Sequence, residues 1–165
     1  MTTFSPPKHR TGPWLAAGRR SIIAQASRYI GALAVLATGV AHFEQYTVDD
    51  YSTVPTIGTL FLFNFIAAIV IVVGLIVPLG RIAGRYADAV RAVIAVGGIG
   101  LGVLSLVALF VSETSGLFGF VEHGYRMAIV SAIVAEAAAA VFLVTFLVAN
   151  GTGLQQIRRH SRGAA

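Results

Sequence analysis

Four long apolar segments, separated by short polar stretches, make up most of the chain. Residues 22–46, 57–79, 87–112 and 125–149 are each dominated by Ala, Val, Ile, Leu and Phe. A helix that crosses a bilayer needs about 20 consecutive, mostly apolar residues, and each segment reaches that length. We therefore predict an all-α membrane protein whose residues 21–150 form a bundle of four transmembrane helices.

The cationic side chains mark one side of this bundle. Residues 1–20 hold several prolines and scattered Lys and Arg, which predicts a flexible basic tail, and residues 151–165 form a second basic tail. Nearly all other arginines lie at the adjoining ends of the spans, and Arg126 alone lies on the opposite side. By the positive-inside rule both tails are cytoplasmic. Because the linkers are short, neighbouring spans are predicted to run antiparallel in an up-down bundle.

The composition supports this picture and removes several classes of function. The chain is 56% hydrophobic and 12% charged, whereas soluble domains carry about 25% charged residues. It has no cysteine, which excludes disulfides, thiol catalysis and iron–sulfur clusters. No phosphate-binding glycine loop or HExxH motif is present, so no motif indicates a cofactor. The net charge of +5 follows the membrane topology, so we expect the lipid bilayer, and not nucleic acid, as the partner of the basic segments.

Three of the polar residues within the predicted spans stand out as candidates for an intramembrane site: His42, Asn64 and Glu136. An ionisable group at bilayer depth costs roughly 2.5–3.5 kcal/mol on insertion scales, which makes Glu136 a candidate functional residue. Counted along their helices, the three lie about 6, 10 and 15 Å below the outer ends of their spans. If their faces turn inward, they form a descending polar series. Such a series fits a water-accessible vestibule with a proton or ligand site, and it equally fits ordinary interhelical hydrogen bonds.

The outer loops contain a second candidate site. Imidazole and carboxylate groups there could bind a divalent metal such as zinc or copper, the candidate ligands being His42, Glu44, Glu122 and His123. Acidic loops are also expected on the outer side of a membrane protein without any metal. Aromatic residues near the same side predict a belt at the interface, namely Tyr46, Tyr51, Phe118, Phe120 and Tyr125.

One face of the third span is lined by small residues at helical spacing: Ala95, Gly98, Gly102 and Ser105. Lipid tails give no hydrophobic driving force between helices, so membrane helices associate through close packing of small side chains. We predict that this face packs tightly against a neighbouring helix.

The stretches GVAHFEQY, YSTVPTIGTLFLFN, GLFGFVEH and IVAEAAAAVFL resemble a family of small four-span membrane proteins of high-GC Gram-positive bacteria. The resemblance covers residues 31–148 and includes His42 and Glu136. It implies the four-span fold and a bacterial plasma (inner) membrane location, but no reaction, because that family has no established activity. A looser similarity to the DoxX-type proteins implies a link to quinone-side redox partners.

Three functions remain open from the sequence. The leading hypothesis is a non-enzymatic accessory or scaffold subunit that binds a protein partner or a second copy of itself within the membrane. The second is a small transporter or proton-coupled carrier that uses Glu136. The third is a redox accessory that binds metal, haem or quinone near His42 at the outer face.

Overall fold

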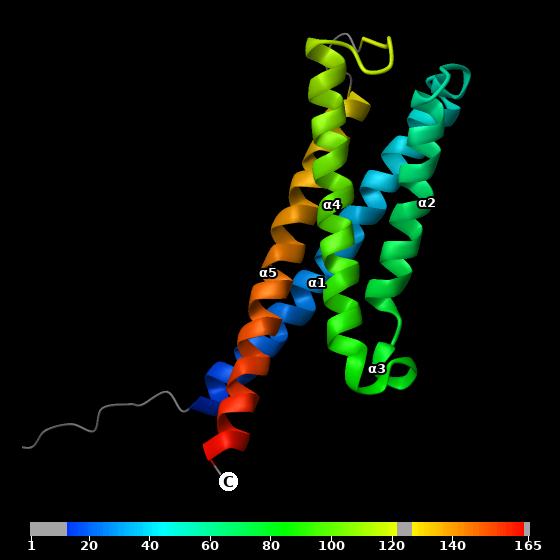
Figure 1. Ribbon diagram of the computed structural model, residues 1–165. Helices are drawn as coiled ribbons and strands as arrows, with labels where there is room; N and C mark the ends of the chain where they lie inside the picture. Colours follow the sequence, from blue (N-terminus) through cyan, green and yellow to red (C-terminus); the bar gives the residue numbers. More distant parts are fainter. Residues whose placement is uncertain (1–12, 122–126, 164–165) are drawn as a thin grey trace, which may run out of the picture.

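The computed structural model describes residues 13–121 and 127–163, which form a bundle of long helices (Figure 1). The long helices are α1 (Pro13–Thr47), α2 (Ile57–Ile76), α4 (Ala87–Thr114) and α5 (Met127–Gly163). Short helices occupy the connections: η1 (Tyr51–Thr53), α3 (Leu79–Ile82) and η2 (Gly84–Tyr86). Four segments are long and apolar enough to cross a membrane, namely Ser21–Thr47, Ile57–Ile76, Gly84–Thr114 and Met127–Gly151. The predicted all-α bundle of four spans is confirmed.

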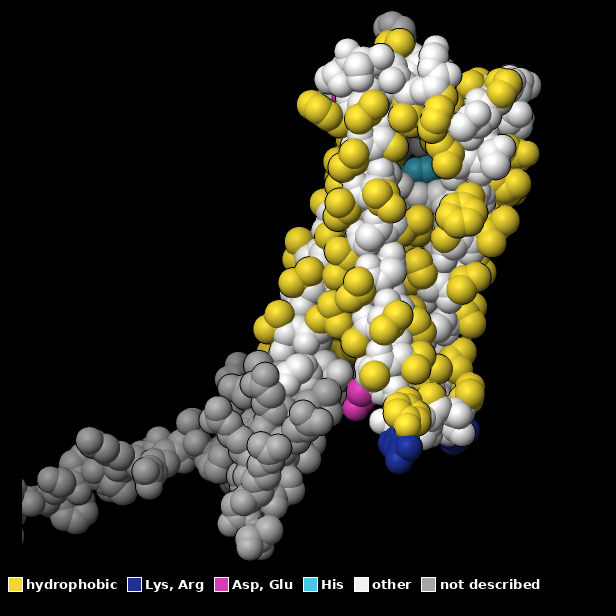
Figure 2. Space-filling model, viewed as in Figure 1, with side chains coloured by type: hydrophobic (Ala, Val, Ile, Leu, Met, Phe, Trp, Pro, Cys, Tyr) yellow, Lys and Arg dark blue, Asp and Glu magenta, His cyan; other side chains and the backbone are white. Residues whose placement is uncertain are grey.

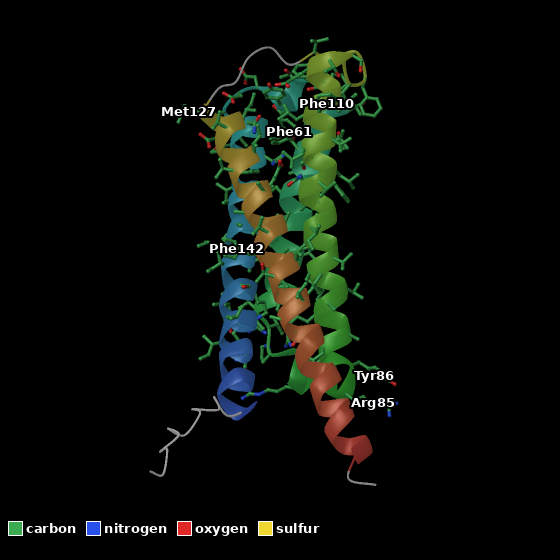
Figure 3. All side chains as sticks on the ribbon, turned by 90° about the vertical axis from the view of Figure 1, so that its left-hand side faces the viewer. Phe61, Arg85, Tyr86, Phe110, Met127 and Phe142 are labelled. Carbon is green, nitrogen blue, oxygen red and sulfur yellow. The ribbon has the colours of Figure 1, made fainter. Side chains whose placement is uncertain are left out.

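The helices alternate in direction and form a closed ring (Figure 1). The most extensive contact joins the first and last spans, α1 and α5, and smaller contacts join α1 to α2, α4 to α5, and α2 to α4. We call the end with η1 the Met127 end and the end with α3 the Arg85 end, after residues labelled in Figure 3. Both ends of the described chain lie toward the Arg85 end (Figure 1). The contact between α2 and α4 is the least extensive of these four.

Helix boundaries differ from the prediction at three places, each with a local cause. Helix α1 begins at Pro13, inside the predicted flexible tail, because proline suits the first helical turn, where its missing N–H costs nothing. Helix α5 continues through the second predicted tail as far as Gly163, so the helix does not stop at the edge of the apolar segment. Helix α2 ends at Ile76 because Val77 precedes Pro78 and adopts an extended backbone with ψ 141°.

The middle of the bundle is a tightly packed core. Leu75 of α2 and Leu143 of α5 are completely buried, and Val35 of α1 is 2% exposed. All four spans meet at Gly98 of α4. A Cβ atom placed on Gly98 would lie 2.8 Å from Cδ1 of Leu143, 3.3 Å from Cγ2 of Ile71 and 3.5 Å from Cγ2 of Val35.

The small-residue face of the third span points into this bundle. Ala95, Gly98 and Gly102 are buried, and Ser105 is half-buried. Gly102 lies in ordinary contact with Glu136, since a Cβ atom placed there would be 3.6 Å from the Glu136 Cβ. The small-residue face of α4 therefore packs against the other helices at Gly98 and contacts the backbone and Cβ of Glu136 at Gly102.

Candidate intramembrane binding pocket

A cavity of about 260 Å³ lies between the helices at the Met127 end of the bundle. All four spans line it, together with the turn that follows α4. Most of the lining is apolar, and the polar exceptions are His42, Gln45, Asn64, Ser105, Ser112 and Glu136. Ligand pockets usually measure roughly 300–1,000 Å³. This cavity is therefore large enough for the head of an elongated molecule whose remainder lies outside.

The cavity opens sideways between α2 and α4, which diverge toward the Met127 end (Figure 1). Three of its lining side chains are highly exposed and form the rim: Leu60 is 42%, Phe63 is 65% and Leu104 is 69% exposed. Figure 2 shows a hollow in this apolar face with a histidine side chain, in cyan, at its base. His42 is the only histidine whose side chain the structure describes. Because α2 and α4 are both spans, the opening faces the bilayer.

Each of the four spans contributes one residue to a polar cluster on the cavity wall: His42, Asn64, Ser105 and Glu136. Asn64 Nδ2 donates to Ser105 Oγ at 2.6 Å, which links α2 to α4. Ser105 of α4 and Glu136 of α5 line the same wall of the cavity. Nε2 of His42 lies 3.9 Å from Oε1 of Glu136, a distance longer than a hydrogen bond. His42, Asn64 and Glu136 are 7%, 5% and 3% exposed.

Aromatic rings close the cavity at the Met127 end. The Tyr51 ring lies 5.0 Å from the Phe61 ring and 5.5 Å from the Phe120 ring, and Phe61 meets the His42 ring edge-on at 5.2 Å. Gly58 allows η1 to pack closely against the start of α2. A Cβ atom at position 58 would lie 2.5 Å from the Tyr51 carbonyl oxygen, so any other residue would clash there. The rings thus connect η1 to the base of the pocket.

A tight turn holds Phe120 in this roof. Leu117 and Phe120 exchange two backbone hydrogen bonds of 2.7 and 2.9 Å, and both residues line the cavity. The two residues between them have positive φ, 51° at Phe118 and 82° at Gly119, which is the pattern of a type I′ turn. Glycine tolerates this backbone, whereas it is unusual for phenylalanine. Phe118 projects outward at the tip and is 70% exposed.

The structure brings together the three residues that the sequence singled out within the spans, His42, Asn64 and Glu136. It places Ser105 between Asn64 and Glu136, although the sequence indicated only a packing role for this residue. The stripe continues beyond Ser105: Gly98, Ser105 and Ser112 recur every seven residues, and the two serines line the cavity. This seven-residue spacing of small and hydroxylated residues was the signal in the sequence that could have identified the side of α4 that lines the cavity.

Only two of the four candidate ligands of the predicted outer-face metal site lie in the part of the chain that is described. Glu122 and His123 lie outside the described residues, Glu44 is exposed, and His42 is buried in the cavity wall. Among the described residues, no group of three His, Asp or Glu side chains is positioned to hold a metal ion. The aromatic-belt prediction is wrong for Tyr51, which is 5% exposed and packs against Phe120 in the roof of the pocket, and Tyr125 lies outside the described residues.

No protein-family model, curated protein or solved structure matches this chain, so the pocket itself is the basis for assigning a function.

Proposed function

We propose that this chain is a non-enzymatic membrane protein that binds a lipophilic small molecule from the bilayer in the pocket between α2 and α4. One observation carries the proposal: an apolar cavity opens toward lipid and ends at a buried polar cluster built by all four spans. Apolar pockets with a few converging polar groups are the usual form of ligand sites. The polar cluster would orient the head of the ligand, while its apolar remainder stays between α2 and α4 or in lipid.

The proposal keeps the accessory role that the sequence favours and adds a ligand to it. A protein partner or a second copy within the membrane remains part of that role. The resemblance to the bacterial four-span family and the distribution of arginines support a plasma-membrane location with both termini cytoplasmic. In this orientation the pocket opens into the outer half of the bilayer.

The core beneath the pocket favours binding over transport. Between the polar cluster and the Arg85 end, the bundle is filled by Val35, Leu75 and Leu143, and Gly98 is in close contact with the last of these. A proton-coupled carrier that uses Glu136 would have to separate the helices at this point. The cavity that reaches the cluster lies in the Met127 half of the bundle.

Single cysteines test whether the pocket is reached from lipid, and the chain has no native cysteine to interfere. Ala132 and Ala139 lie two turns apart on the same face of α5, and both are buried, at 7% and 1%. Ala132 lines the cavity, whereas Ala139 belongs to the packed core. In proteoliposomes, we expect N-phenylmaleimide to label Ala132→Cys at least about tenfold faster than Ala139→Cys, because access limits thiol reactivity.

Equal labelling rates at the two alanine positions would contradict the proposed pocket. The same set of variants reports the orientation. Ser52→Cys, in the exposed part of η1, should react with a membrane-impermeant maleimide added outside intact cells. Protection of that cysteine in intact cells, with labelling after lysis, would reverse the proposed orientation without affecting the pocket.

A further inference from the structure

The hydrogen-bonding roles of the two His42 ring nitrogens can be deduced from the contact of this ring with a backbone carbonyl group. Nδ1 of His42 lies 2.9 Å from the backbone carbonyl oxygen of Thr38. A carbonyl can only accept, so Nδ1 must carry a proton. In the neutral imidazole, Nε2 is then an acceptor, and this is the nitrogen that faces Glu136 at the base of the hollow.

At the other end of the cluster, one N–H group of the Asn64 amide donates to Ser105 Oγ. Nearby, Gln45 Nε2 donates to the Ala41 carbonyl at 3.3 Å, and the Ser112 hydroxyl donates to the Leu109 carbonyl at 3.0 Å. One donor on each of these three side chains is thus directed into the protein.

Acceptors, by contrast, are left over. Asn64 Oδ1 is buried and has no hydrogen-bond partner among the described residues. Nε2 of His42 and Oε1 of Glu136 face each other without a hydrogen bond, across a gap that one polar atom could bridge. Buried polar atoms without partners are rare in proteins, and a bound ligand is one way to satisfy them.

Charge restricts the ligand further. Among the described residues, the cavity lining contains the carboxyl group of Glu136 but no Lys or Arg. A phosphate, sulfate or carboxylate head would therefore meet acceptors and the Glu136 carboxyl group, with no cation among the described lining residues to compensate for its loss of hydration.

We infer that the ligand is a lipophile whose head donates hydrogen bonds and carries no negative charge, and that this head binds at His42, Asn64 and Glu136. The inference rests on the proposed function and adds the chemical class of the ligand. A hydroxyl group and a protonated amine share the required donor. The hydroxyl would donate to one of the two neutral acceptors, His42 Nε2 or Asn64 Oδ1, whereas the amine would pair with an ionised Glu136.

Four probes with the same ten-carbon chain test the head group: decanol, decylamine, decyl methyl ether and decanoate. Each would be titrated into nanodiscs containing protein labelled with ¹⁵N-histidine, with the probe concentration expressed per lipid. The readout is the resonance of the His42 ring nitrogens, assigned with a His42→Gln variant. We expect at least one donor-headed probe to bind about three- to tenfold more tightly than the ether, the range for one net hydrogen bond, and decanoate to bind most weakly.

A matched pair of variants then locates the effect. Asn64→Leu removes the unpartnered acceptor and should abolish most of the preference for a donor. Phe63→Leu alters the neighbouring apolar rim and should keep that preference. If Asn64→Leu does not fold, the comparison of the four probes in the wild-type protein still decides the matter.

Each outcome has a distinct meaning. Equal binding of the ether and both donor-headed probes, or tightest binding of decanoate, would overturn the inference and leave the proposed pocket standing. Failure of all four probes to shift the His42 resonance would count against the pocket as well. Tighter binding of decanol or of decylamine supports the inference and identifies the head as neutral or cationic.

Discussion

Replacing Gly98 with leucine is expected to destabilise the bundle more than any other single apolar substitution in α4. Even the first added carbon would lie 2.8 Å from the Leu143 side chain, and Ile71 and Val35 are within 3.5 Å of it. Overpacking a dense core typically costs about 1–3 kcal/mol and sometimes more. Because three other helices meet Gly98, no single neighbour can move aside to relieve the clash. We expect Gly98→Leu to lower the thermal unfolding temperature in detergent by several degrees or to prevent folding.

Val103 provides the matched control for this substitution. It lies on the same helix, is 47% exposed and does not line the cavity. Val103→Leu should leave the unfolding temperature within the experimental error of the wild type. If Gly98→Leu and Val103→Leu are tolerated equally well, the four-helix contact at Gly98 is wrong.

The second large effect is expected at Glu136. Lysine at this position would place a cation in a site that is 3% exposed, beside His42. A lysine at bilayer depth costs roughly 2.5–3.5 kcal/mol on insertion scales. Leucine would remove the carboxyl group from the polar cluster without adding charge, and a polar neighbour left unsatisfied costs about 1–3 kcal/mol. Glutamine keeps both the shape and an acceptor.

The expected order of unfolding temperature is therefore wild type close to Glu136→Gln, then Glu136→Leu, with Glu136→Lys lowest. Circular dichroism or intrinsic fluorescence in detergent would measure it. A Glu136→Lys protein as stable as Glu136→Gln would show that the side chain lies against lipid or solvent, outside the cluster.

The four spans were predictable because long apolar runs have few alternatives in a chain with so few charges. The polar cluster was predictable only in part. His42, Asn64 and Glu136 stand out because each interrupts an apolar segment, and a polar group in that setting needs a partner. Which partner it finds depends on helix rotation and tilt, and these are determined by packing between segments far apart in the sequence. Ser105 illustrates this, since its hydroxyl oxygen accepts a hydrogen bond from Asn64 of α2 although its spacing indicated a packing role.

Features that arise from loops were least predictable. The roof of the pocket depends on Tyr51 folding back over α2 at Gly58 and on a turn with positive φ at Phe118. Neither the aromatic content nor the charge of these loops distinguishes a roof from an interfacial belt. The opening between α2 and α4 arises because these two helices contact each other less than the other neighbouring pairs do. This difference depends on all four helices together and cannot be predicted from the sequence of one segment.

The most direct test of the pocket is to identify the small molecules that co-purify with the protein. Ala108 of α4 lines the cavity, whereas the adjacent Val107 is 52% exposed and lies outside the lining. Tryptophan at Ala108 would fill the cavity, and tryptophan at Val107 would face lipid. Mass spectrometry should find a lipophile enriched in equal amounts with the wild type and Val107→Trp and depleted at least about tenfold in folded Ala108→Trp, since a filled pocket leaves no room for the head. The same small molecules in the same amounts from all three proteins would contradict the account.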